Sequence, residues 1–362
     1  MIGSPKTQFA LTIGISTFYF LVANVSYSWN VESLNIPDNV VIWKYAVWKN
    51  RAFLAIPRAI NEEKDRYVPT LVEVPWPKIN SLMSDANIAT VPFSKKGSSK
   101  RRYTALTSVT GLDVDPRGRL WILDAPDKNG YWPQIVIHDL KRNDRLVSST
   151  TLINVSPKHL KTLITDPFES QWGSCGYVAD AGDEMIVVYC LGEGKWWKLR
   201  MTHGPEVPRV YSTNLAISRK HSILYMTGYH THDLFSINLE NIRTSQALCR
   251  TDIQNVTVTW LGNKLGSSVG LFCDSKDGLH YFMPLDRASV RWDTKSPISA
   301  ESHSVLVQSN DIPCITDYIM DAQKSIWGLV NSDCSGVTKP NVTERGRLRS
   351  RTVRIPKHSS AS

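Results

Sequence analysis

The 362-residue sequence lacks the short motifs that mark most enzymes and nucleotide-binding proteins. It contains no phosphate-binding loop, no dinucleotide fingerprint, no zinc-ribbon cysteine spacing and no catalytic-triad order. It also lacks helical periodicity over several turns, and the segment Lys158–Leu163 is at most one short helix. The sequence therefore assigns no reaction, no cofactor and no metal, and it leaves open whether the protein is an enzyme.

Two weak motifs do not change this interpretation. The run Gly266–Gly270 matches Gly-x-Ser-x-Gly, but a nucleophile elbow requires a strand before it and a helix after it. Here an apolar strand follows, which predicts a loop between sheets. His230 and His232 could ligate a metal from one face of a strand. They lie between two apolar runs, however, and this placement predicts a solvent-facing turn.

What the sequence does contain is a recurring hairpin pattern, seen most clearly in Thr110–Ala125 (TGLDVDPRGRLWILDA). Two apolar runs of Val, Ile, Leu and Trp suit half-buried strands, and the Asp-Pro-x-Gly between them is turn chemistry. Pro116 presets φ for the first turn position, and Gly118 can adopt positive φ without steric cost. This stretch therefore predicts a β-hairpin.

The same order of strand, Asp or Ser, polar turn and apolar-aromatic strand recurs along the chain. Successive copies lie roughly 40–65 residues apart, which is typical of propeller blades with four strands each. The pattern therefore predicts an all-β, six-bladed β-propeller, with an irregular β-sandwich as the alternative. Beyond the first hairpin, the copies are Tyr177–Tyr189, Asn214–Met226, Gly270–Phe282 and Thr316–Leu329, with a weaker one at Asn50–Ile56.

The two ends of the chain predict segments outside the propeller. Lys6 precedes an apolar stretch from Phe9 to Val25, which fits a signal peptide over residues 1–28 better than a membrane anchor. We predict the propeller over residues 29–340 and a disordered basic tail over residues 341–362. After cleavage of the signal peptide, we expect no membrane span.

Charge is distributed unevenly along the chain. The formal net charge is +9, and six basic residues against Glu344 give the last nineteen residues +5 of it. The remaining +4 makes the folded body only weakly basic, so we expect no nucleic-acid partner. A tail with few apolar residues and many like charges is predicted to be solvated and disordered.

Cysteines and glycosylation sequons both indicate secretion. Six cysteines are an even number, as a disulfide framework in an oxidising compartment requires. Asn-x-Ser/Thr acceptors occur at Asn154, Asn255 and Asn341, as well as at Asn24 beside the predicted cleavage site. The sequence therefore predicts an extracellular glycoprotein.

Symmetry about two turns suggests the disulfide pairing, although six cysteines allow 15 pairings. Cys175 and Cys190 are equidistant from the turn at Gly182-Asp183, and Cys314 and Cys334 are equidistant from Lys324. Opposed strand residues lie close enough to form a disulfide. The scheme leaves Cys249 to pair with Cys273.

Several groups of residues together resemble the ordered signatures of the yellow/major royal jelly protein family. The resemblance covers nearly the whole predicted mature chain, from about Val40 to Asn331. The chain departs from the family at Arg117 and Trp132, where the family usually has cysteines. The matching runs are Val41–Tyr45, Phe53–Arg58, Val68–Leu71, Pro75–Pro77, Gly118–Asp124, Pro133–Leu140, Tyr177–Asp180, Ile186–Tyr189 and Leu261–Lys264.

The resemblance implies a secreted six-bladed propeller that binds a small aromatic amine or catechol-derived ligand in its central channel, with a role in pigmentation or melanin formation. Thr316 and Asn331 resemble channel-lining positions of amine-binding relatives, and their side chains suit an ammonium or a ring hydroxyl. The alternative is a dopachrome-converting isomerase or tautomerase of melanin formation. Such an enzyme needs a positioned acid or base, and no His or Glu stands out for that role.

Overall fold

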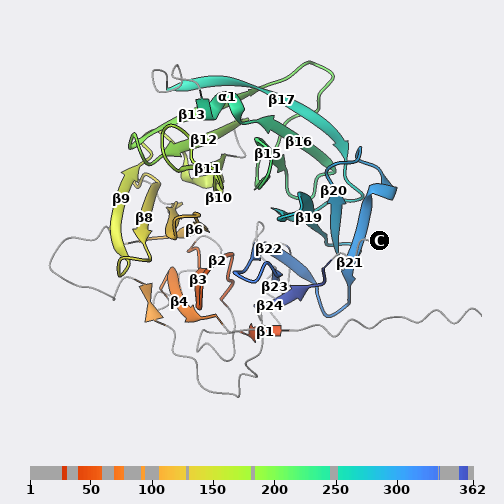
Figure 1. The fold of residues 1–362 in the computed structure, drawn as a ribbon, viewed down its shortest axis with the longest axis horizontal. Helices are drawn as coiled ribbons and strands as arrows, with labels where there is room; N and C mark the ends of the chain where they lie inside the picture. The colour runs from red at the N-terminus through yellow and green to blue at the C-terminus, as the bar shows by residue number, and fades with distance from the viewer. Residues whose placement is uncertain are drawn as a thin grey trace, which may run out of the picture.

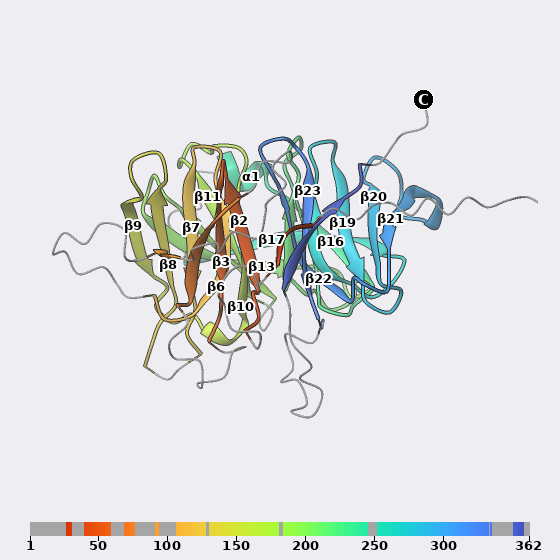
Figure 2. The ribbon, with the colours of Figure 1, turned by 90° about the horizontal axis from the view of Figure 1, so that it is seen from below.

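The computed structural model describes residues 27–30, 40–58, 69–76, 91–93, 106–127, 130–180, 184–244, 252–332, 334 and 350–357. Over these residues the fold is all-β, as predicted: five sheets are arranged in a ring around a central axis (Figure 1). Seen from the side, the strands run between the two faces of the ring (Figure 2). The described part of the chain contains one α-helix, α1 (Glu240–Thr244), and none of its helices is long and apolar enough to cross a membrane.

Four of the sheets contain four strands and one contains eight. Sheet I contains β2 (Lys44–Trp48), β3 (Arg51–Ala55), β4 (Leu71–Pro75) and β5 (Val91–Pro92). Sheet II contains β6 (Val109–Val114), β7 (Arg119–Asp124), β8 (Gln134–Asp139) and β9 (Arg145–Thr151). Sheet III contains β10 (Leu160–Thr165), β11 (Cys175–Asp180), β12 (Met185–Cys190), β13 (Lys195–Thr202), β14 (Asn214–Ile217), β15 (Ile223–Thr227), β16 (Asp233–Asn238) and β17 (Ile253–Asn263).

The last two sheets complete the ring. Sheet IV contains β18 (Val269–Cys273), β19 (Gly278–Met283), β20 (Ala288–Asp293) and β21 (His303–Gln308). Sheet V contains β22 (Cys314–Met320), β23 (Ile326–Asn331), β24 (Arg351–Ile355) and, from the other end of the chain, β1 (Tyr27–Asn30). Because β1 pairs with β24, the two ends of the described chain share one sheet and hold the ring closed.

The innermost strands β2, β6, β10, β14, β18 and β22 surround the axis. Each contacts the next in this order, and β22 contacts β2. Neighbouring sheets pack face to face, so both faces of a sheet are buried. This explains why β12 (MIVVYC) and β19 (GLHYFM) are almost entirely buried rather than alternating between buried and exposed positions.

The long strand β17 joins two groups of four strands into sheet III. Its first part, Ile253–Thr257, pairs in parallel with β13, and its second part, Val258–Asn263, pairs antiparallel with β16. All other strand pairs of the described residues are antiparallel and mostly follow chain order. The two halves of sheet III, β10–β13 and β14–β17, are therefore each built like the four-stranded sheets.

A shared hydrogen-bond pattern explains the recurring turn seen in the sequence. In three inner hairpins, an Asp carboxylate accepts one bond from the backbone N–H four residues later and one from the side chain six residues later. Because both donors lie in the next strand or, for Ser325, directly before it, the Asp fixes the turn to the strand that follows. The bonds, 2.8–3.0 Å long, run to Asp115 from Arg119 N and Trp121 Nε1, to Asp274 from Gly278 N and His280 Nε2, and to Asp321 from Ser325 N and Trp327 Nε1.

The predicted hairpins are confirmed, with one displacement. Four copies form the first two strands at the axis, and Gly118 has φ +79° as its turn requires. The copy at Tyr177–Tyr189 instead forms β11 and β12, the second and third strands of its group. Its inner strand is β10, and the predicted short helix over Lys158–Leu163 is wrong beyond the 3₁₀ turn Pro157–His159. The β-branched residues of LKTLIT favour the extended strand.

Two predicted disulfides are present and the third is not. Cys175 and Cys190 face each other across β11 and β12 with their Cα atoms 4.1 Å apart, and Cys314 bonds to Cys334 with Cα atoms 5.1 Å apart. The predicted Cys249–Cys273 bridge is wrong, because Cys273 is a buried free thiol on an innermost strand. The described residues on either side of Cys249 belong to α1 and to β17, an outermost strand, while Cys249 itself lies outside the described residues.

The structure also corrects the predicted boundary at the C-terminal end. Part of the segment predicted as a disordered tail, residues 341–362, forms β24, whose Val353 and Ile355 are buried in the core. The alternation of apolar and basic residues in RTVRI is a strand pattern. The prediction of disorder considered only the number of like charges in the tail and not this alternation. At the other end, β1 includes Tyr27 and Ser28 of the predicted signal peptide, and residues 1–26 lie outside the described residues.

Candidate functional site

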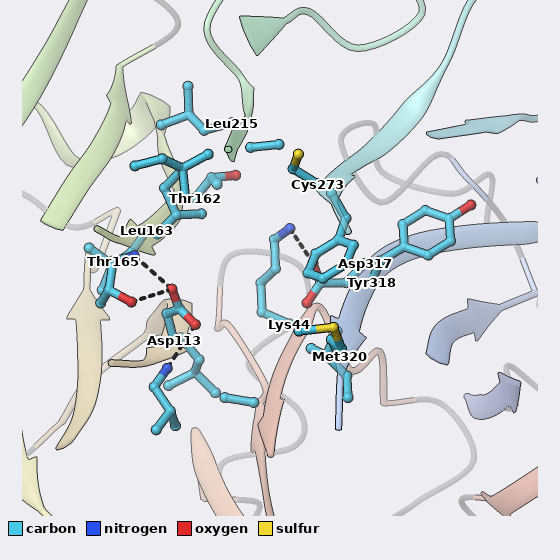
Figure 3. Close-up of a pocket in the computed structure, with 18 of the residues that line it drawn as sticks. Lys44, Asp113, Thr162, Leu163, Thr165, Leu215, Cys273, Asp317, Tyr318 and Met320 are labelled. Atoms are coloured by element: carbon cyan, nitrogen blue, oxygen red, sulfur yellow. Dashed lines mark hydrogen bonds and ion pairs between the residues drawn. The ribbon is translucent and has the colours of Figure 1, made fainter. Parts of the chain in front are cut away.

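A cavity of about 270 Å³ lies on the axis of the ring, enclosed by the six innermost strands (Figure 3). These strands contribute both apolar side chains and a few charged or polar ones, which is the usual composition of a ligand site. The polar side chains that matter for its chemistry are Lys44, Asp113, Thr165, Asn214, Arg219 and Asp317.

Lys44 and Asp317 form an internal ion pair at the wall of the cavity. Lys44 Nζ lies 2.9 Å from Asp317 Oδ1, and the backbone N–H of Tyr45 donates to Asp317 Oδ2 at 3.2 Å. Burial raises the pKa of Asp317, and the charge of Lys44 opposes that rise. Because the lysine already neutralises this carboxylate, Asp317 is not an acceptor for a second cation.

Asp113 is different, because its hydrogen-bond partners are all uncharged. Its carboxylate accepts bonds from Thr165 N at 2.6 Å, from Thr165 Oγ1 at 2.8 Å and from Val114 N at 2.8 Å. Burial raises the pKa of Asp113, and these bonds offset only part of the rise. Within the described residues, no lysine or arginine lies within ion-pair distance of it, and the more distant charge of Arg219, which lines the same cavity, also offsets only part of the rise. Asp113 is thus a buried carboxylate at the wall of a cavity that makes no ion pair with a described residue.

Aromatic residues belong to the lining of the same cavity. Phe272 and Tyr318 both line the cavity, and the guanidinium of Arg219 lies 5.7 Å from the centre of the Phe272 ring. The hydroxyl of Tyr318 is already paired with Ser289 Oγ at 2.9 Å. The tyrosine ring is only 4% exposed and points away from the centre of the cavity toward β20 (Figure 3), so Phe272 on β18 is the aromatic side chain that a planar ligand would meet.

Asn214 adds an unused donor. Its side chain is 1% exposed and lines the cavity, and no acceptor among the described residues reaches its Nδ2 atom. A buried amide N–H without an acceptor is costly, so a ligand or ordered water with an acceptor oxygen would stabilise it. Cys273 also lines the cavity, but burial raises the pKa of its thiol far above neutrality, which keeps it protonated and unreactive.

The two residues predicted to bind ligand lie next to each other but outside this lining. Asn331 Nδ2 donates to Thr316 Oγ1 at 2.7 Å and to Ile42 O at 3.1 Å, and Ser350 Oγ donates to Asn331 Oδ1 at 2.5 Å. Both residues are buried. Thr316 directly precedes Asp317 on β22, but neither Thr316 nor Asn331 is among the residues that line the cavity. Their contact with a ligand remains a prediction.

The network predicts that Asn331→Ala lowers stability. The substitution removes three internal hydrogen bonds and leaves a buried threonine hydroxyl and a backbone carbonyl without this donor. We expect the free energy of unfolding to fall by about 1–3 kcal/mol, measured by denaturant titration. Asn241→Ala, at an exposed position of α1, is the matched control and should change it little. Equal stability of Asn331→Ala and the parent protein would contradict the assigned network.

The other residues singled out in the sequence lie away from the cavity lining. His230 and His232 are exposed in the turn between β15 and β16, and Gly266–Gly270 leads from β17 into β18, both as predicted. Among the described residues, no three His, Cys, Asp or Glu side chains are grouped to hold a metal ion. Asn154 is exposed at a turn and Asn255 is exposed on β17, whereas Asn341 lies outside the described residues.

Sequence reasoning missed Lys44, Asp113 and Asp317, although a signal for two of them was present. Asp113 and Asp317 each lie inside an apolar inner strand, in GLDV and CITDYIM. Asp is depleted in strands, so an Asp within such a run needs a reason. An Asp at an interior position of an innermost strand therefore indicates a residue that lines the central cavity.

The chain is similar to one protein family and, at low identity, to several solved structures. A family model described as major royal jelly protein matches residues 107–339. Among solved structures, a catalytically inactive virginiamycin B lyase from Staphylococcus aureus with quinupristin is similar at 12% identity and TM-score 0.47, covering 82% of this chain and 83% of that one. A structure of U3-55K is similar at 8% identity and TM-score 0.48, covering 87% and 80%. No curated protein matches the chain.

Proposed function

Because the chain belongs to the major royal jelly protein family, we propose that it is a secreted six-bladed β-propeller whose central cavity binds a small aromatic amine or a catechol-derived molecule. The observation that carries the proposal is the buried carboxylate of Asp113, which makes no ion pair with a described residue and lines the same cavity as the aromatic residue Phe272. A role in pigmentation or melanin formation belongs to the same proposal.

The blade count rests on the two halves of sheet III. Each half contains four strands in the order found in the other sheets, and each supplies one innermost strand to the ring. Counting β10–β13 and β14–β17 as separate blades gives six, with β1 as the outer strand of the last blade. The parallel pairing of β13 with β17 then links two neighbouring blades at their outer edge.

Secretion rests on the cysteines and on the predicted signal peptide. Two disulfides among the described residues suit an oxidising compartment. The exposed acceptors Asn154 and Asn255 are accessible to a glycosyltransferase, and glycosylation there and at Asn341 is part of the proposal.

The chemistry of the cavity fits an aromatic ammonium. The ammonium of the ligand would pair with Asp113, and the aromatic ring of the ligand would lie against Phe272. A volume of about 270 Å³ is close to the lower end of the range for ligand sites, so the ligand is small. Asn214 Nδ2 would donate to an oxygen of the ligand.

Isothermal titration calorimetry with dopamine, serotonin and histamine tests the proposal. Catechol is the matched control for dopamine, because it keeps the ring hydroxyls and lacks the ammonium. We expect at least one amine to bind, and catechol to bind more weakly than dopamine because it cannot pair with Asp113. Absence of heat with every amine up to millimolar concentration would refute amine binding.

The proposed contacts of Thr316 and Asn331 can be tested separately. Since both residues have internal partners, a ligand would reach them only by extending past Asp317 along the channel or by displacing those partners. If they contact the ligand, Asn331→Ala weakens amine binding by more than its effect on the folded fraction explains.

The alternative function is conversion of dopachrome, and one observation favours it. Asp113 is a buried carboxyl with a raised pKa inside a cavity, which suits a general acid or base. Turnover of dopachrome by purified protein, compared with heat-inactivated protein and with the Asp113→Asn variant, distinguishes an enzyme from a binding protein.

A further inference from the structure

A second concavity, of about 260 Å³, lies on the face of the ring opposite the mouth of the central cavity. Strand β6 pairs Val109 with Asp124 at one end and Val114 with Leu120 at the other. The central cavity is lined from the Val114 end, whereas the second concavity is built by the residues that follow Asp124 and by the loop before β10. Its lining includes Asp127, Tyr131, Trp132, Ser156, Pro157 and Lys158.

Two neighbouring aromatic side chains form an exposed surface there. Tyr131 is 51% exposed and Trp132 is 48% exposed, whereas six other tryptophans of the described chain are buried in the core. Adjacent aromatic side chains that remain in water within one concavity mark a recognition surface more often than a packing accident.

The loops that carry these rings are held in place. The backbone N–H of Leu152 donates to Pro133 O at 2.8 Å, directly after Trp132. Gln134 starts β8, and its Nε2 donates to the buried Asp124 at 3.0 Å. On the other side, Pro157 begins a 3₁₀ turn. The chain directly after Trp132 and the segment before β10 are therefore fixed, which lowers the ordering cost of binding on these two sides of the concavity.

Polar groups of mixed character surround the rings. Among the described lining residues, Asp127 supplies a carboxylate and Lys158 an ammonium, so their charges balance. The hydroxyl of Ser156 makes no capping bond to the 3₁₀ turn that it precedes. These lining residues carry no excess of positive charge for a polyanion, and a lipid chain would find too many polar groups among them.

We propose that this concavity binds a neutral pyranose ring of a carbohydrate. One face of a pyranose is a patch of C–H groups that packs flat on an indole or phenol ring, and its edge carries hydroxyls that both donate and accept. Trp132 and Tyr131 provide the flat surface, Asp127 accepts, Lys158 donates and Ser156 does both. This site is separate from the central cavity and does not depend on amine binding.

The sugar could come from two sources that share this chemistry. Asn154 starts the sequon Asn154-Val155-Ser156, and Ser156 lines the concavity, so a glycan on Asn154 would begin within two residues of it. A free oligosaccharide or a glycan of another molecule would present the same ring.

The test uses the full chain expressed in a secretory host, as the parent protein and as Asn154→Gln, which carries no glycan at that position. Chitotriose, cellotriose and mannotriose are titrated to millimolar concentration and followed by calorimetry and tryptophan fluorescence. We expect the Asn154→Gln protein to bind at least one trisaccharide with a change in fluorescence. Adding Trp132→Ala should weaken that binding at least tenfold. Trp260→Ala is the matched control, since Trp260 is also exposed, at 40%, but lies on β17.

The two sources give different results. If a glycan on Asn154 occupies the concavity, the parent protein binds the trisaccharide more weakly than Asn154→Gln does, and if the ligand is external, both bind alike. A second variant, Asp127→Asn with Lys158→Met, should also weaken binding while keeping the rings. Absence of binding to Asn154→Gln by all three sugars, or equal binding after Trp132→Ala, would overturn the proposal.

Discussion

Replacing Asp274 with asparagine should lower the free energy of unfolding at neutral pH by about 3–5 kcal/mol. Asp274 Oδ2 accepts bonds from Arg291 Nε at 2.7 Å and from His280 Nε2 at 3.0 Å, and its other oxygen accepts the turn N–H of Gly278. The Arg291 and Asp274 side chains are only 8% and 10% exposed. An asparagine that keeps the turn bond would turn its NH₂ group toward these donors and leave the arginine charge buried without its partner.

The same change should alter how stability depends on pH. Burial alone would raise the pKa of Asp274, but the bonds from His280, Arg291 and Gly278 hold it well below its ordinary value. A carboxyl with a lowered folded pKa stabilises the fold above its unfolded pKa of about 4, and this contribution is lost as the pH falls toward the folded pKa. The difference in stability between the parent and Asp274→Asn should therefore be constant above about pH 5 and become smaller in more acidic solution.

Urea titrations at several pH values measure both effects. Asp286→Asn, in the exposed turn between β19 and β20, is the matched control, because it removes a carboxylate that no described cation pairs with. A loss of less than about 1 kcal/mol for Asp274→Asn would show that the carboxylate does not hold Arg291 in the folded protein.

The recurring turn shows how far the sequence alone could reach. The Asp-turn-aromatic pattern predicted the inner hairpins because one carboxylate both closes the turn and holds a Trp or His six residues later. The pattern is local, so it is visible in sequence. The innermost strand β10 was missed because its turn lacks this arrangement, and β24 was missed because its partners β23 and β1 are distant in sequence.

The central site was less predictable, because it forms only when six distant strands meet. Nothing local indicates that Lys44 neutralises Asp317, 273 residues away, while Asp113 lacks such a cation. Family resemblance pointed instead to Thr316 and Asn331, which do come together but through bonds to each other and to Ile42 and Ser350. The resemblance thus pointed to Thr316, which directly precedes the lining residue Asp317. Only the packed structure shows which polar side chains have no internal partner and can bind a ligand.

Asp113→Asn should weaken the binding of an aromatic amine by at least about thirtyfold, which corresponds to about 2 kcal/mol. The carboxylate lines the cavity and makes no ion pair with a described residue, and asparagine keeps its size while removing its charge. The variant should still fold, because an asparagine oxygen can accept the two bonds that Thr165 donates. Binding of a neutral analogue such as catechol should change much less.

The pH dependence of binding provides a second, independent readout. Burial raises the pKa of Asp113, so the free protein takes up a proton there at a higher pH than an exposed Asp does. An ammonium pairs only with the ionised form. Amine affinity of the parent protein should therefore be constant at neutral pH and fall up to tenfold per pH unit below the raised pKa, since the proton competes with the ligand.

Two comparisons separate this account from a general loss of structure. Asp127→Asn removes an exposed carboxylate at the other concavity and should leave both the amine affinity and its pH profile unchanged. Asp113→Asn should abolish the acidic fall in affinity, because the group that takes up the proton is gone. If its amine affinity still falls with acid as in the parent protein, the titrating group is another residue, and Asp113 is not the partner of the ammonium.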